Sequence, residues 1–243
     1  MTKMWKYEKS FVIGSDQNQE KILLWWIQNF RRNVRQTPLV FLDFGISDFA
    51  LQHVYSDVDL VVPFRTIENR KVWFNKPGAM KKSESRISCW MDIDTQILTD
   101  ISDIFDHHVS GKLTIARDPV MIRQGQDKAM NSGIVVYDEE TLPILDLWEQ
   151  ECINNHTVRG DQEALRELCL RDKTVDNSIN ILSQDYNWLR LMYMRGEDSL
   201  SKKVIHWTGP TGKDILLKKI IPKFDEKREE IMTKIGHDWK PEQ

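Results

Sequence analysis

The chain has 243 residues, enough for one sizeable α/β domain with its own core. Hydrophobic residues make up 40% and charged residues 29%, and the formal net charge of -3, with Lys and Arg scattered, argues against a nucleic-acid binder. No apolar run reaches the roughly 18 residues of a membrane span, and the N-terminus lacks the apolar stretch of a signal peptide. The three cysteines have no metal-type spacing. We therefore expect a soluble, cytoplasmic protein with reduced cysteines.

Short apolar runs alternate with helical patterns along the chain. Strands are predicted at residues 10–16, 37–45, 57–64, 87–92, 111–119, 130–138 and 202–206. Helices are predicted after Asp16, which is a candidate N-cap, then briefly within 73–85, and over 139–153, 160–172 and 213–236. This alternation predicts an α/β fold with a mainly parallel sheet covered by helices on both faces. Because no linker or repeat divides the chain, we expect a single domain over 1–243, with 214–243 as a C-terminal helical extension.

The stretch ISCWMDIDTQIL places two carboxylates one residue apart at the end of a buried strand. Side chains two positions apart on a strand share a face, so Asp92 and Asp94 would repel each other and lose hydration. Ligands of such sheets bind beyond the carboxyl ends of the strands, and a cation there would relieve the repulsion. Taken alone, the pair has a simpler interpretation, in which Asp94 caps a turn at TQIL.

Four segments in a consistent order resemble one family of enzymes. They are WMDIDTQILTDISDIFD, MNSGIVVYD, GDQEAL and VIHWTGPTGK, and Lys76 lies upstream of the first. Together they resemble the retaining nucleotide-sugar glycosyltransferases of the GT-A fold, the family that includes glycogenin and the bacterial lipopolysaccharide galactosyl- and glucosyltransferases. The resemblance implies a Rossmann-like, mainly parallel mixed sheet flanked by helices.

The same resemblance implies a metal site. Asp92, Asp94 and His206 match the family's ligands for a divalent cation, usually Mn²⁺ with Mg²⁺ as the alternative, that bridges the donor diphosphate. Carboxylate oxygens suit a hard cation, and an added imidazole favours Mn²⁺ over Mg²⁺. His206 by itself fits a buried, hydrogen-bonded structural histidine equally well.

The resemblance also implies a donor site. Asp161, Gln162 and Asn131 match residues that lie at the reacting sugar. The implied donor-binding positions are Lys76, Asp92, Ser132, Gly133, Gly209 and Lys213, with Gly14, Ser15 and Asp16 at the end of the first strand. Two alternatives remain open at this point: MNSG fits an ordinary turn into a strand, and Asp161 fits the N-cap of the following helix.

The expected function is metal-dependent transfer of a sugar, with retention, from a nucleoside diphosphate donor such as a UDP-sugar to a saccharide, lipid-linked or protein acceptor. The chain departs from the family pattern at two places. Many members have the lysine one residue closer to the histidine and followed by Pro-Trp, whereas here Lys213 is followed by Asp214. Some members also have an aspartate where this chain has Val158. These departures keep a second hypothesis open, an inactive nucleotide-sugar-binding scaffold or sensor. A nucleotidylyltransferase fits less well, because IGSDQNQ lacks a Gly-rich basic loop. The C-terminal helices could contact a membrane surface peripherally.

Overall fold

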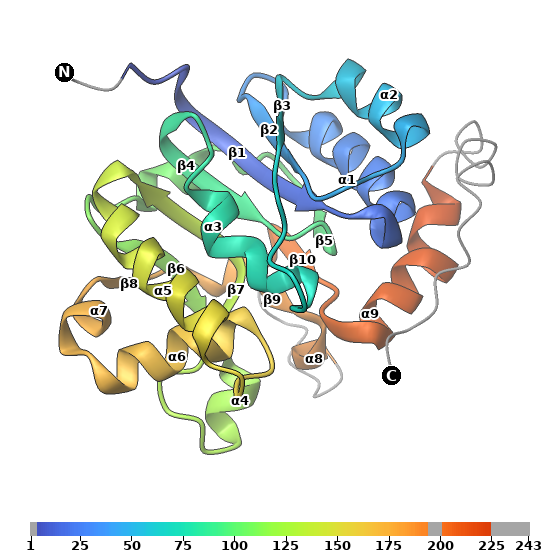
Figure 1. Ribbon diagram of the computed structural model, residues 1–243. Coiled ribbons are helices and arrows are strands. Elements are labelled where there is room, and N and C mark those ends of the chain that lie inside the picture. Colours follow the sequence, from blue (N-terminus) through green and yellow to red (C-terminus); the bar gives the residue numbers. More distant parts are fainter. Residues whose placement is uncertain (1–3, 194–200, 225–243) are drawn as a thin grey trace.

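The computed structural model describes residues 4–193 and 201–224, which form a single α/β domain (Figure 1). Within these residues a mixed sheet of seven strands runs through the molecule. Its strands are β1 (Tyr7–Ser15), β2 (Leu39–Asp43), β3 (Leu60–Pro63), β4 (Ser85–Met91), β6 (Leu113–Arg117), β7 (Met130–Asp138) and β8 (Ile179–Ile181). The strands predicted at 10–16, 37–45, 57–64, 87–92, 111–119 and 130–138 are therefore all present. β8 is the one strand of this sheet that the sequence did not predict.

The sheet is mainly parallel, as predicted. Its strand order is β3-β2-β1-β4-β7-β6-β8. β1 lies in the interior of the sheet and pairs in parallel with both β2 and β4, whereas β7 is antiparallel to both of its neighbours, β4 and β6. The carboxyl end of β4 therefore lies beside the beginning of β7, which places the Asp92 segment next to the Asn-Ser-Gly segment.

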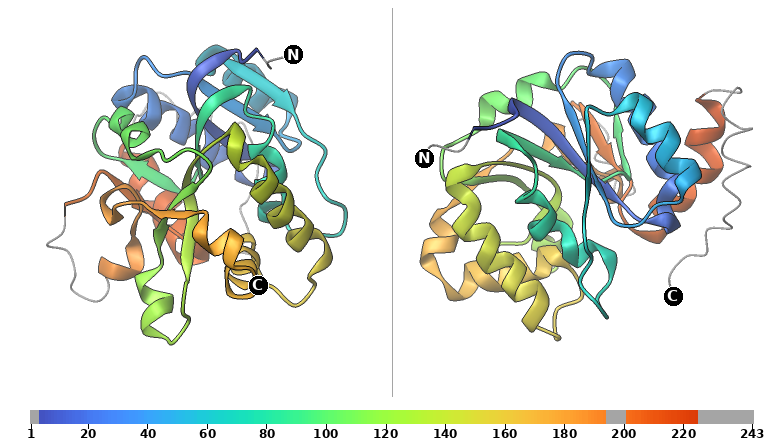
Figure 2. Two further views of the ribbon diagram at one scale, coloured as in Figure 1. Left: turned by 90° about the vertical axis from the view of Figure 1, so that its left-hand side faces the viewer. Right: turned by 45° about the horizontal axis from the view of Figure 1, so that its top comes forward.

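Helices cover both faces of this sheet (Figures 1 and 2). They are α1 (Glu20–Asn33), α2 (Asp48–Asp57), α3 (Lys76–Met80), α4 (Pro119–Arg123), α5 (Leu142–Asn154), α6 (Asp161–Arg171), α7 (Lys173–Asn177), α8 (Arg190–Tyr193) and α9 (Gly209–Ile215). Alternate residues of β1 point to opposite faces, so Phe11 and Ile13 pack in the core under α1, while Val12 packs in the core under α3, α5 and α6. None of the helices among the described residues combines the length and apolarity that crossing a membrane requires.

A second, smaller sheet carries the C-terminal part of the site. β10 (Val204–His206) lies between β5 (Thr95–Ile97), to which it is antiparallel, and β9 (Trp188–Leu189), to which it is parallel. The register pairs His206 with Thr95, and the Trp207 amide donates to the Asp94 carbonyl at 2.8 Å. This pairing fixes the backbone of the predicted histidine directly beside the Asp-x-Asp turn.

The segment after β10 is helical, as the sequence predicts, and begins earlier than expected, at Gly209. It continues from α9 through one π-helical turn and one 3-10 turn, Leu216–Ile220 and Ile221–Lys223. Its apolar side packs against α1, where the Trp25 and Phe224 rings meet edge to face at 6.0 Å between centroids. Of the expected extension over 214–243, residues 225–243 lie outside the described part of the chain, so that boundary remains a prediction.

Two of the three capping roles considered for the aspartates are wrong. Asp16 does hold the N-cap position of the 3-10 turn that leads into α1, but its side chain makes no capping hydrogen bond. Gly160, not Asp161, holds the N-cap position of α6. The TQI segment forms β5 instead of a turn capped by Asp94. The physical reason for Asp161 and Asp94 is competition, because an ammonium and an imidazole offer their carboxylates stronger partners than a backbone amide does.

Candidate active site

The predicted site residues converge on one cavity of about 800 Å³ at the carboxyl ends of β1 and β4. Those that line it are Asp16, Lys76, Asp92, Asp94, Asn131, Ser132, Asp161, Gln162, His206, Gly209 and Lys213. They come from six separate segments of the chain and gather at the edge of the sheet where ligands of α/β proteins bind. Gly14, Ser15 and Gly133 lie behind this lining.

Asp92 follows directly after β4 and is held from three sides. Its backbone amide donates to the Gly133 carbonyl at 2.7 Å, and its carboxylate accepts from the Trp90 indole N–H at 2.7 Å and from the Lys76 ammonium at 3.0 Å. The side chain remains 27% exposed towards the cavity. Burial and the neighbouring charge of Asp94 raise the pKa of Asp92, although Lys76 opposes this. The Asp92 carboxylate is thus oriented and accessible, and its negative charge is only partly compensated by Lys76.

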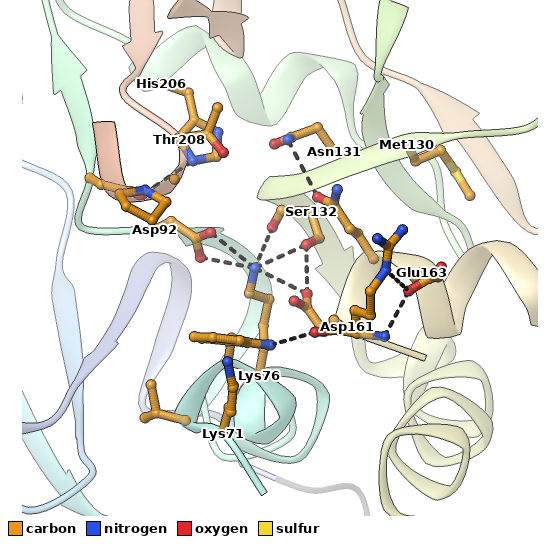
Figure 3. A pocket seen from close by; sticks show the side chains of 18 of the residues that line it. Lys71, Lys76, Asp92, Met130, Asn131, Ser132, Asp161, Glu163, His206 and Thr208 are labelled. Carbon is orange, nitrogen blue, oxygen red and sulfur yellow. Dashed lines mark hydrogen bonds and ion pairs between the residues drawn. The ribbon is translucent and has the colours of Figure 1, made fainter. Parts of the chain in front are cut away.

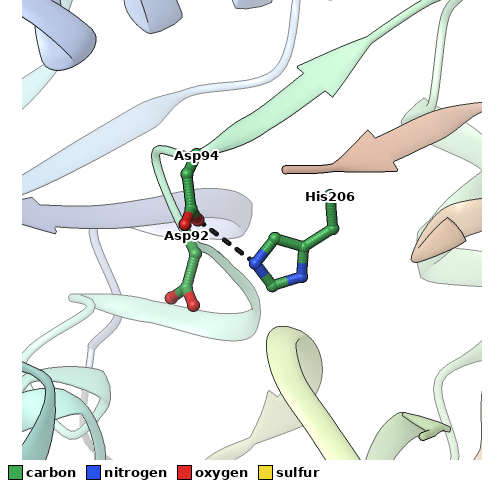
Figure 4. Close-up of side chains that lie close together, drawn as sticks. All are labelled: Asp92, Asp94 and His206. Carbon is green, nitrogen blue, oxygen red and sulfur yellow. Dashed lines mark ion pairs between the residues drawn. The ribbon is translucent and has the colours of Figure 1, made fainter. Parts of the chain in front are cut away.

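Asp94 faces His206, with 3.1 Å between its Oδ1 and the imidazole Nε2 (Figure 4). Burial alone would raise the pKa of Asp94, but His206, assisted by Lys213 and Lys76, lowers it to about 2. Potential ligand atoms of Asp92, Asp94 and His206 all lie within 4.8 Å of one another. Among the residues that the structure describes, no other group of three His, Cys, Asp or Glu side chains lies so close.

This group fits a divalent cation. Two carboxylates and one imidazole match the donors that Mn²⁺ accepts, and Asp94 and His206 are buried while Asp92 opens towards the cavity. The three carboxylates of Asp92, Asp94 and Asp161 outnumber the single ammonium of Lys76 among them, so the cluster keeps a net negative charge that a divalent cation would offset. A purely structural His206 would make the same contact with Asp94, so cation binding by this group stays a proposal.

Lys76 lies at the centre of a second group of polar residues, formed with Asp92, Ser132 and Asp161 (Figure 3). Its buried ammonium contacts Asp92 at 3.0 Å, Asp161 at 3.2 Å, and both the backbone and hydroxyl oxygens of Ser132 at 3.0 Å. Burial disfavours the charged form, but Asp161 and Asp92 outweigh it and raise the pKa of Lys76 above its ordinary value. A lysine in this position joins the candidate metal site to the candidate sugar site.

Asp161 and Asn131 also line the cavity. The Asp161 carboxylate accepts from the Ser132 hydroxyl at 2.5 Å, and its backbone carbonyl accepts from the buried Trp148 indole at 2.7 Å. The Asn131 amide approaches the side-chain oxygen of Gln162 at 3.4 Å. MNSG is therefore not a turn: Asn131 and Ser132 lie within β7 and present polar groups to the cavity. These amide, hydroxyl and carboxylate groups suit the hydroxyls of a sugar.

Lys213 and Gly209 line the same cavity and belong to α9. Gly209 has a φ of +76°, a conformation that glycine adopts without strain. Lys213 lines the cavity and contributes to lowering the pKa of Asp94. Its charge thus reaches the candidate metal site even though the residues after it depart from the family pattern.

Solved structures of glycosyltransferases match the whole domain, although no family model and no curated protein matches the sequence. The galactosyltransferase LgtC, in complex with donor and acceptor sugar analogs, matches 94% of this chain over 96% of its own length, with a TM-score of 0.67 at 13% identity. GlyE from Streptococcus pneumoniae TIGR4 matches 95% of this chain over 62% of its own, with a TM-score of 0.63 at 13% identity. Mouse xyloside xylosyltransferase 1 matches 82% of this chain over 97% of its own length, with a TM-score of 0.55 at 14% identity.

The chain has the GT-A glycosyltransferase fold. The fold that the sequence resemblance implies is therefore confirmed, while retention, metal dependence and the donor stay predictions. The sequence did not indicate two residues of this site. Trp90 has the sequence pattern of a core residue, yet its indole donates to Asp92 and orients it. The side-chain oxygen of Asn187 lies 3.0 Å from Nδ1 of His206, and the YNW segment that contains Asn187 has no recognisable motif. The signal for Trp90 was its position near the end of β4, two residues before Asp92.

Gly133 gives the first test of this geometry. A methyl group on its Cα would overlap the Cε1 and Nδ1 atoms of the His206 ring, so Gly133→Ala should push the imidazole away from Asp94. We expect the free energy of unfolding to fall by about 1–3 kcal/mol, as for other overpacked sites, and Mn²⁺ affinity to fall with it. Gly160→Ala is the matched control, because its added methyl would meet only Trp73, at 3.8 Å. Thermal unfolding and Mn²⁺ titration of both variants check this, and normal Mn²⁺ affinity in Gly133→Ala would contradict the placement of His206.

Proposed function

We propose that this protein transfers a sugar from a nucleoside diphosphate donor, with UDP-sugars as the first class to screen, to an acceptor hydroxyl, and that it requires a divalent cation. The observation that carries the proposal is the convergence of two groups on one cavity of a GT-A fold. One is the Asp92, Asp94 and His206 group, which fits a cation, and the other is the polar group around Lys76 and Asp161.

Asp92, Asp94 and His206 would hold the cation, with Mn²⁺ as the expected ion and Mg²⁺ as the alternative. When bound, such an ion supplies Lewis-acid neutralisation of the departing diphosphate. The chain itself supplies further positive charge to the cavity, with Lys76 on α3 and Lys213 on α9. Both lysines would attract the diphosphate electrostatically and hold it in place as the glycosidic bond breaks.

Asp161, Gln162 and Asn131 would orient the donor sugar. The Asp161 carboxylate is already shared between the Ser132 hydroxyl and the Lys76 ammonium, which makes it a weak nucleophile. This supports a mechanism without a covalent intermediate, in which the acceptor attacks from the face of the leaving group and the anomeric configuration is retained. An inverted anomeric proton in the NMR spectrum of the product would contradict that part of the proposal.

The end of β1 would bind the nucleoside. Asp16 lines the cavity there, and one of its carboxylate oxygens is buried without a hydrogen-bond partner, while the other accepts from Asn18 at 3.1 Å. Burial raises the pKa of Asp16, so a base or ribose donor that reached the free oxygen would stabilise its charged form. Gly14 and Ser15 would support this turn from behind, because a side chain at Gly14 would collide with Phe44.

The acceptor would enter on the solvent side of the donor sugar. Trp73, Met130 and Arg159 line the cavity and would offer the acceptor an apolar surface with a cationic edge. LgtC was solved with donor and acceptor sugar analogs, which supports saccharides as the first acceptors to screen.

A thermal-shift panel of UDP, GDP, dTDP and CDP, each with and without Mn²⁺, tests the proposal. A ligand present at about 100 times its dissociation constant adds roughly 2.7 kcal/mol to the free energy of unfolding. We expect the largest shift with UDP, and only when Mn²⁺ is present. Stabilisation by no nucleotide would contradict a nucleotide-sugar site, and donor binding without hydrolysis or transfer would indicate the inactive scaffold instead.

A further inference from the structure

Asn187 is a buried polar residue to which neither the sequence nor the proposed mechanism assigns a role. It lies between the 3-10 turn Gln184–Tyr186 and β9, and its exposed fraction is 0%. Burying an amide is costly unless its donors and acceptor are all hydrogen-bonded. Every polar atom of the Asn187 side chain does have a partner, and these partners are Asn131 and His206.

The backbone of β7 determines which way the Asn187 amide points. Its Nδ2 lies 3.1 Å from the backbone carbonyl of Asn131 and 3.0 Å from the Asn131 side-chain oxygen. That side-chain atom must be oxygen, because it accepts from the Gly133 backbone N–H at 3.1 Å. Both partners are therefore acceptors, so the nitrogen of Asn187 must face them and its oxygen must face His206.

This orientation fixes the tautomer of His206. The Asn187 Oδ1 lies 3.0 Å from Nδ1 of the ring and can only accept, so Nδ1 carries the proton. Nε2 is the atom that faces Asp94, and a ring that keeps its proton on Nδ1 can offer the Nε2 lone pair to a cation that binds there. A histidine that binds a cation through Nε2 needs this tautomer and a ring that does not rotate.

We propose that Asn187 is the positioning residue of the candidate metal site: it holds His206 in the Nδ1–H tautomer and aims Nε2 at the cation. The inference rests on the proposed divalent cation site and assigns the residue that prepares it. Asn131 anchors Asn187, so the ring of His206 is tied through two amides to the main chain of β7.

Two substitutions of similar shape separate the hydrogen bond from the packing. Asn187→Leu removes the acceptor for Nδ1–H, and Asn187→Asp keeps it while losing the donor to Asn131. The control is Asn29→Leu, because Asn29 is also buried and bonds both backbone groups of Ile97, away from the cavity. Mn²⁺ itself is the probe, with the free ion measured by electron paramagnetic resonance during titration.

We expect Asn187→Leu to weaken Mn²⁺ binding about 10- to 100-fold, the usual effect of removing a partner of a metal-binding histidine. Asn187→Asp should bind Mn²⁺ more tightly than Asn187→Leu, because it keeps the acceptor for Nδ1–H, and Asn29→Leu should leave the affinity unchanged. Folded Asn187→Leu protein with wild-type affinity would overturn the inference alone, as would equal losses in the Leu and Asp variants. Absence of Mn²⁺ binding by the wild type would overturn both the proposed function and this inference.

A measurement on the wild-type protein decides the matter if Asn187→Leu does not fold. With Zn²⁺ as a diamagnetic cation, long-range ¹H–¹⁵N spectra of ¹⁵N-histidine-labelled protein report which nitrogen of His206 carries the proton. The proton is expected on Nδ1. A proton on Nε2 would overturn the inference.

Discussion

Asp94→Asn is expected to abolish Mn²⁺-dependent nucleotide binding, with a loss of affinity beyond the 10- to 100-fold typical of residues that only support a ligand. The substitution removes a buried negative charge and keeps the shape of the side chain. The low pKa of Asp94 means that the wild-type carboxylate is ionised throughout the neutral range. The wild type therefore has a negative charge at this position, and the variant has none. With the ring proton on Nδ1, the new amide can also donate to Nε2 of His206 and so occupy a second ligand position.

The control for this variant is Asp106→Asn, which neutralises an exposed carboxylate in the same part of the chain. Thermal shifts of both variants with UDP, with and without Mn²⁺, give the readout, and far-UV circular dichroism confirms that each is folded. Asp106→Asn should behave as the wild type. A Mn²⁺-dependent UDP shift of normal size in Asp94→Asn would remove Asp94 from the site.

The sheet was predictable because its strands are long and buried. β1, β2, β4, β6 and β7 each contain continuous apolar runs, and such runs indicate strands without knowledge of their neighbours. The antiparallel direction of β7 was not predictable, since it depends on how the intervening chain returns to the sheet. Three of the four described strands of two or three residues, β5, β8 and β9, carry no period that a sequence could show, whereas the fourth, β10, falls within the strand predicted at 202–206.

The helix α2 was missed for a different reason. Only Ala50 and Val54 are buried in it, so its apolar pattern is too sparse to indicate an amphipathic helix. Its N-terminus is nevertheless specified, because Ser47 caps it and the buried carboxylate of Glu20 accepts from the Ser47 hydroxyl at 3.0 Å. That contact joins two helices across 27 positions of the sequence and has no local signal.

Within the site, the sequence indicated the residues that face the cavity but not those that hold them. Asp92, Asp94 and His206 are recognisable by residue type and by their place in a family-like order. Asn187 acquires its role from hydrogen bonds to residues 19 and 56 positions away, and a lone asparagine in a loop does not reveal such partners. Capping roles for Asp94 and Asp161 were reasonable locally, and long-range contacts with His206 and Lys76 override them.

Lys76→Met is expected to destabilise the metal-free protein by about 3–5 kcal/mol, the usual cost of removing one partner from a buried ion pair. The methionine has a similar length but leaves Asp161 buried without its cation and deprives Asp92 of one of two partners. Denaturant unfolding measures the change. Lys82→Met, which replaces an exposed lysine close by in the chain, is the control and should change stability by less than about 0.5 kcal/mol.

The double variant Lys76→Met/Asp161→Asn separates charge from packing. Asparagine can still accept the Ser132 hydroxyl proton but carries no charge, so the double variant should recover much of the lost stability, whereas additive losses would contradict a charge pair between Lys76 and Asp161. Mn²⁺ provides a second readout, because Asp92 without its ammonium partner should bind a cation more tightly. The ion should therefore stabilise Lys76→Met more than the wild type, and equal stabilisation of the two would mean that Lys76 does not compete with the cation for Asp92.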